Sequence, residues 1–131
     1  MQTAVTQAFR RIRRTDAVLD IHIAGDDMAR AEQVAADLDA DYEVFATLPA
    51  VTARDVTLKA KEAISSLRAF GYDNEAEIAR AFFGQRQPRD AAWLNDLRTL
   101  IAGLELLAPG DTYALTCLRS IIAGLGKPRL V

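Results

Sequence analysis

Cysteine and histidine are nearly missing from this chain of 131 residues, which has one of each. The lone Cys117 excludes an intramolecular disulfide and a structural zinc site built on cysteines. Any catalytic pair of the Ser–His or Cys–His kind has to use His22, and its neighbour Asp20 lies on another helical face, where it cannot orient the imidazole. We therefore expect a reducing, cytoplasmic compartment and neither residue at a reactive centre.

Long apolar runs are also missing. Asp20 and His22 interrupt the first apolar segment, and Glu105 interrupts the one around Leu104, so we expect neither secretion nor a membrane-spanning helix. With 50% apolar and 26% charged residues, the composition is instead that of a globular protein, and the length suits a single domain over residues 1–131. The net charge of −2 provides no overall attraction to nucleic acid or to an anionic membrane.

Proline is rare, and Pro49 is the most informative of the four. Its ring removes a helical hydrogen-bond donor and pushes Leu48 out of the α region. Thr52 and Asp55, three residues apart, resemble a capping box. One helix therefore ends before Pro49 and the next begins at Thr52.

Apolar residues recur at helical spacing along the rest of the chain, without convincing strand alternation. We predict an all-α fold, a bundle-like single domain of five or six helices, with a break at Gly25 favoured over one long kinked helix across residues 3–48. Asn74 and Glu77 suggest a second capping box, and the helix that carries Trp93 is expected to be the most buried of the set. The predicted helices run from 3 to 24, from 28 to about 45, from 52 to an end near Gly71, from about 74 to a stop at Gly84, and from about 90 to 108. Pro109, Gly110 and Asp111 are expected to form a turn and a cap, after which a last helix runs to a stop at Gly126 and Pro128.

The second predicted helix carries an apolar seam with a/d heptad spacing. The seam is longer than a lone helix needs, which predicts an interface, within the fold or between subunits. The seam also contains Ala31, and its candidate interface residues are Met28, Ala35, Leu38, Tyr42 and Phe45.

Charge is unevenly distributed. Residues 1–14 contain four arginines and no acid, whereas residues 15–47 contain nine acids against Arg30 alone. This asymmetry is typical of a solvated polar face opposite the seam. Otherwise it predicts a homodimer in which each basic start meets the acidic helix of the other copy, or an interface for a basic partner. The candidate basic patch consists of Arg10, Arg11, Arg13 and Arg14.

A nucleic-acid-binding regulator is the alternative. It would use the basic patch together with the basic residues near 54–68, which are Arg54, Lys59, Lys61 and Arg68. We do not favour it, because the four arginines of the patch are expected to spread over most of the circumference of a helix.

No motif indicates a metal, a cofactor or catalysis. Asp37, Asp39 and Asp41 alternate as in a calcium loop, but Tyr42 occupies the position that requires glycine. Cys117 is expected to be a small core residue. We therefore predict a non-enzymatic helical protein that acts through a protein partner or through self-association.

The stretch from Ala46 to Lys61 resembles the signature P-A-T-T-x-x-G-L-x-x-K-x-R of small, uncharacterised, helix-rich proteins common in alphaproteobacterial genomes. Val51 stands where that signature has threonine, and Asp55 where it has glycine. The resemblance implies a bacterial protein with an all-helical domain and brings no known activity. The matching residues are Pro49, Ala50, Thr52, Val56, Lys59 and Lys61.

Overall fold

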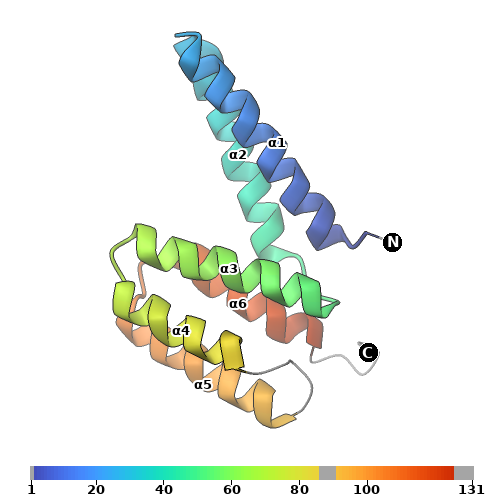
Figure 1. The fold of residues 1–131 in the computed structure, drawn as a ribbon, viewed down its shortest axis with the longest axis vertical. Coiled ribbons are helices and arrows are strands. Elements are labelled where there is room, and N and C mark those ends of the chain that lie inside the picture. Colours follow the sequence, from blue (N-terminus) through green and yellow to red (C-terminus); the bar gives the residue numbers. More distant parts are fainter. Residues whose placement is uncertain (1, 86–90, 126–131) are drawn as a thin grey trace. The chain divides into compact units, whose positions relative to one another are not determined.

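The computed structural model describes residues 2–85 and 91–125, and these form six α-helices and no strand (Figure 1). The predicted all-α, bundle-like fold is thereby confirmed. The helices are α1 (Ala4–Ala24), α2 (Met28–Thr47), α3 (Ala53–Ala69), α4 (Asp73–Gln85), α5 (Ala91–Leu107) and α6 (Thr112–Leu125). None of the six, as far as the chain is described, is both long and apolar enough to cross a bilayer.

The helices group into two compact units, residues 1–45 and 46–131, which are described separately below. The sequence leads us to expect one core over the whole chain. Each unit instead has buried residues of its own. The single domain over residues 1–131 therefore stays a prediction.

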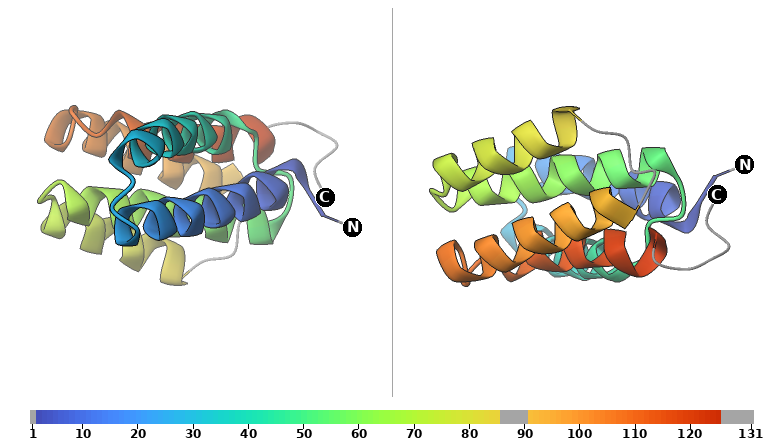
Figure 2. Two further views of the ribbon diagram at one scale, coloured as in Figure 1. Left: turned by 90° about the horizontal axis from the view of Figure 1, so that it is seen from above. Right: turned by 90° about the horizontal axis from the view of Figure 1, so that it is seen from below.

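The first unit is an antiparallel hairpin of α1 and α2 (Figures 1 and 2). α1 begins where Thr3 Oγ1 accepts a hydrogen bond from the Thr6 amide at 3.1 Å, and it ends at Gly25, whose N–H donates to the Ile21 carbonyl. Asp26 follows with a φ of 58°, a left-handed conformation that aspartate tolerates better than most residues. The chain reverses here, so the predicted break at Gly25 is confirmed and residues 3–48 contain two helices.

Aromatic and polar contacts join the two helices of the hairpin. The Phe45 ring is fully buried, and its centroid lies 6.0 Å from that of Phe9. Further along, Thr15 Oγ1 donates a hydrogen bond of 2.7 Å to Asp41 Oδ2. The hairpin is therefore joined by ring packing near its open end and by a half-buried polar pair near its middle.

The second unit is a four-helix bundle. Each helix packs against its neighbours in chain order, and α3 also packs against α6, which closes the ring (Figure 2). Seven of the 14 residues of α6 are buried, against four of the 17 residues of α5. The prediction that the Trp93 helix is the most buried is wrong, because its apolar arc is wider than its neighbours cover and leaves Leu106 84% exposed.

The turn between α2 and α3 follows the sequence prediction closely. Thr52 Oγ1 accepts a hydrogen bond from the Asp55 amide at 3.1 Å, as an N-cap should. Asp55 is fully buried, and its Oδ2 accepts from the Val51 amide at 3.0 Å. The helix ends at Phe70, and Gly71 follows with a φ of 86°, which is the usual left-handed end of a helix.

The second predicted capping box is wrong. Asn74 lies inside α4, which begins at Asp73, and the carbonyl of Tyr72 accepts the hydrogen bond from the Ala76 amide. Glu77 pairs with arginines instead of reaching back to the helix start. Gly84 does not stop α4, which continues to Gln85. The predicted stops at Gly126 and Pro128, and the loop residues 86–90, lie outside the described residues.

Asp111 ties the last helix to the third. Its Oδ1 accepts a hydrogen bond from the Ala114 amide at 3.1 Å, which confirms the predicted cap of α6. The same carboxylate accepts from Ser66 Oγ on α3 at 2.9 and 3.0 Å. Because Asp111 is only 1% exposed, it is a buried acid whose oxygens are satisfied by one backbone and one side-chain donor.

Candidate functional sites

The heptad seam of α2 lies largely inside the hairpin. Leu38 and Phe45 are buried, Ala35 and Tyr42 are half-buried, and the ring contact with Phe9 shows that Phe45 faces α1. Met28 is 55% exposed beside the reversal of the chain. Most of the candidate interface residues therefore pack within one chain, and Met28 is the one at the surface.

A different set of apolar residues lies exposed on the hairpin. Val18, Ile21 and Ile23 near the end of α1 are 43%, 67% and 53% exposed, and Met28 follows across the turn. Val18 and Ile21 are one helical turn apart and share a face. The sequence pattern did not lead us to predict this exposed set, because the heptad seam of α2 was the only apolar surface considered. The signal was present, since α1 is apolar on more than one side between Val18 and Ile23.

The four arginines of the basic patch are all exposed on α1. At about 100° per residue they cover an arc of about 160°, so the expectation that they spread over most of the circumference is wrong. Arg13 lies 5.7 Å from the centre of the Phe9 ring, a cation–π distance. No ion pair joins any of the four to another residue in the described part of the chain. The four arginine side chains therefore lie on one half of the circumference of α1.

Lys59 is fully buried in the bundle, although sequence reasoning grouped it with basic residues available to a nucleic acid. Its Nζ donates to the Ala46 carbonyl at 3.4 Å. Burial lowers the pKa of Lys59 to about 8, against the opposing influence of Cys117 and Asp55. Lysine is rarely buried, but its position one turn from Val56 was a usable signal that it lies on the inner face of α3.

Cys117 is a small core residue, as predicted. Its side chain is fully buried, and burial raises the pKa of the thiol to about 12. Since the thiolate is the reactive form, this sulfur is inert at neutral pH.

Gly124 of α6 lies against the backbone of Ala50. The Ala50 amide donates to the Ser120 carbonyl at 3.2 Å, and a Cβ placed on Gly124 would lie 1.7 Å from the Ala50 carbonyl oxygen. Ala50 itself is fully buried. The Pro49–Ala50 pair of the signature-like stretch therefore marks a close backbone contact, which accounts for the glycine at position 124.

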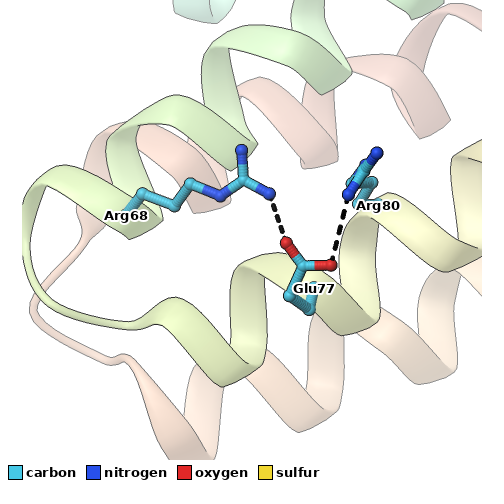
Figure 3. A network of polar contacts seen from close by, with 3 residues as sticks. All are labelled: Arg68, Glu77 and Arg80. Carbon is cyan, nitrogen blue, oxygen red and sulfur yellow. Dashed lines mark hydrogen bonds and ion pairs between the residues drawn. The ribbon is translucent and has the colours of Figure 1, made fainter.

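An exposed ionic network joins α3 to α4 (Figure 3). The carboxylate of Glu77 accepts a hydrogen bond from Arg68, and its second oxygen lies 3.5 Å from the Arg80 guanidinium. The hydrogen bond from Arg68 is the main reason that the pKa of Glu77 is lowered. Two cations thus share one acid here.

Next to this network is a cleft of about 250 Å³ between α3, α4 and the start of α5. Its apolar walls include Phe83 and Trp93, whose ring centres lie 6.2 Å apart. Lys61 and Arg80 also line it. The sequence pattern did not predict this cleft, because the way in which α3, α4 and α5 meet is a tertiary feature.

Comparison of the chain with protein-family models, with curated proteins and with solved structures finds no match.

Proposed function

We propose that this chain is a non-enzymatic self-association module, and that its α1–α2 hairpin pairs with the hairpin of a second copy in a symmetric dimer. The observation that carries the proposal is the exposed apolar cluster at the closed end of the hairpin, which consists of Val18 and Ile21 on one face of α1 and Met28 across the turn. A monomer rarely leaves several large apolar side chains exposed together unless a partner covers them.

Two helices are a marginal unit by themselves, because each can bury only the stripe that faces the other. Two such hairpins packed together make a four-helix bundle, in which every helix has two neighbours. Ile21 alone is 67% exposed in the hairpin, and its burial would contribute about 1.5 kcal/mol or more. The apolar cluster therefore supplies the affinity.

Charge complementarity favours a second copy over an unrelated partner. The outer face of α1 carries the four arginines of the basic patch, while α2 exposes Glu32, Asp37 and Asp39. A two-fold axis forms each complementary contact twice. Exposed ion pairs contribute only about 0 to 1 kcal/mol each, so the charges mainly set orientation.

The buried polar groups support a role without catalysis. Cys117 keeps its proton at neutral pH, and Lys59 is enclosed in the bundle. Neither group reaches a substrate from solvent. The single cysteine and the Pro49–Lys61 resemblance lead us to place the protein in the cytoplasm of a bacterium.

Light scattering over a range of concentrations tests the proposal. The wild-type chain should show twice its mass of 14.3 kDa, and Ile21→Glu together with Met28→Glu should reduce this to the monomer. Leu106→Glu is the matched control, because Leu106 is 84% exposed on the other unit and its replacement should leave the dimer intact. A monomer at every concentration would overturn the proposal.

The same samples distinguish the nucleic-acid alternative. If the wild-type chain is monomeric and shifts a DNA duplex at low salt, with affinity that falls steeply as salt rises, the arginines serve phosphate and not a second copy. Replacing Arg10, Arg11 and Arg14 by Glu would then abolish the shift. In the dimer that we propose, the same triple variant weakens association, and wild-type protein does not shift the duplex.

A further inference from the structure

The cleft of the second unit has the composition of a small-molecule site. Val56, Ala60 and Ile64 line it from α3, Phe83 from α4 and Trp93 from α5. Phe82 stacks close behind, with its ring centre 5.4 Å from that of Trp93. Ligand sites are typically concave and apolar with a few convergent polar groups, and this cleft has that form.

The two charged residues that line the cleft are both cationic. Lys61 comes from α3 and Arg80 from α4, so the two charges approach the cleft from different helices. Lys61 is exposed and, in residues 2–85 and 91–125, has no ion-pair partner. Within the described residues, Arg80 has Glu77 as its only ion-pair partner, at 3.5 Å, and Glu77 is held more closely by Arg68. Because Glu77 is shared between two arginines, it does not neutralise the positive charge of the cleft.

We propose that this cleft binds a small amphipathic carboxylate, such as a medium-chain fatty acid. The carboxylate lies between Lys61 and Arg80, where a guanidinium offers paired donors that match its two oxygens. The apolar chain enters between Phe83 and Trp93. A volume of about 250 Å³ equals that of about eight water molecules, which suits an anion of roughly eight to twelve non-hydrogen atoms.

The chain carries its own reporter for this binding. Trp93 lines the cleft and is the sole tryptophan of the 131 residues, so its fluorescence reports on this cleft alone. Octanoate titrated to millimolar concentration should give a saturable change in Trp93 emission. Octan-1-ol and octylamine are matched probes with the same chain and a neutral or cationic head, and they should bind at least tenfold more weakly.

Four variants test where the anion and its chain bind. Lys61→Gln and Arg80→Gln should each weaken octanoate binding about three- to tenfold, as expected for partly exposed charge-assisted contacts. Arg98→Gln is the control, because Arg98 is exposed on α5 and does not line the cleft. Thr57→Phe should block the cleft and abolish binding. Helical circular dichroism of each variant confirms that it is folded.

The outcomes separate clearly. Saturable octanoate binding that Lys61→Gln and Arg80→Gln weaken, and that Arg98→Gln leaves unchanged, supports the proposal. No change in emission with octanoate overturns it. Equal binding of octan-1-ol and octanoate, or unchanged affinity in the Lys61→Gln, Arg80→Gln double variant, shows that the site does not select an anion and also overturns it. Neither result bears on the hairpin dimer.

Discussion

Replacing Gly124 by Ala should strongly destabilise the bundle, although the same change in an ordinary helix position is stabilising. The added Cβ would lie 1.7 Å from the Ala50 carbonyl oxygen and 2.8 Å from the Ala50 nitrogen. Real Cβ contacts are essentially never closer than 3.0 Å. The difference, 3.0 − 1.7, requires the two backbone segments to separate by more than an ångström, because the neighbour is main chain and cannot rotate away.

The free-energy cost follows from that separation. Overpacking a well-packed contact costs about 1 to 3 kcal/mol. Loss of the hydrogen bond from the Ala50 amide to the Ser120 carbonyl adds about 1 kcal/mol. The helix-propensity gain of alanine over glycine offsets less than about 1 kcal/mol, because Gly124 is next to the end of α6. We expect a net loss of about 1 to 4 kcal/mol in the free energy of unfolding.

Gly103→Ala is the matched control. Gly103 lies within α5, and a Cβ there meets no atom within 4 Å. It should stabilise the protein by about 0.5 to 1 kcal/mol. Urea unfolding followed by circular dichroism at 222 nm measures both variants under the same conditions. A Gly124→Ala protein as stable as wild type, or stabilised like Gly103→Ala, would refute the close contact.

Three further perturbations have defined outcomes. Phe45→Ala should cost about 3 to 5 kcal/mol in urea unfolding, because the ring is fully buried; a loss below about 0.5 kcal/mol would contradict its place in the core. Asp111→Ala should cost about 2 to 3 kcal/mol of stability, because it removes the cap of α6 and leaves Ser66 without its acceptor. Asp111→Asn keeps an acceptor oxygen and should cost clearly less. Equal losses in the two variants would refute the role of Asp111 as a hydrogen-bond acceptor for α6 and Ser66. Burial lowers the pKa of Lys59 from 10.5 in the unfolded chain to about 8 in the folded chain. Between pH 8 and pH 10.5 only the unfolded chain therefore holds the proton on Lys59. The free energy of unfolding should rise by up to about 3 kcal/mol as the pH increases through this range. Cys117, with its pKa raised to about 12, has the opposite effect on stability above pH 9. The measurement therefore uses a Cys117→Ala background and compares this single variant with the double variant that also carries Lys59→Met. An identical pH dependence of unfolding in the two proteins would contradict the assignment to Lys59.

Local signals predicted the helices well. Pro49, Thr52, Gly71 and Asp111 each act within one turn of chain, through a missing donor, a cap or a left-handed residue, and such effects are legible in the sequence. The capping box at Asn74 failed because Glu77 found partners nine residues back and three residues ahead, at Arg68 and Arg80.

Features that depend on how helices meet were not predictable in the same way. Phe45 of the α2 seam packs against Phe9 of α1, but nothing in the spacing of the seam predicted that α1 would be its neighbour. The burial of Lys59, the contact of Gly124 with Ala50 and the cleft beside Trp93 each require residues far apart in the chain to come together. A single sequence without relatives does not report those pairings.

The hydrogen bond from Thr15 to Asp41 has a consequence for alignment. The apolar residues of α2 repeat with heptad spacing, so a slide of α2 along α1 by one heptad would still present an apolar seam. A slide in one direction would set Asp41 opposite Ala8, which has no side-chain donor. The half-buried carboxylate would then lose the hydroxyl group that donates to it. This one polar pair therefore disfavours that slide, because a half-buried carboxylate without its donor is costly.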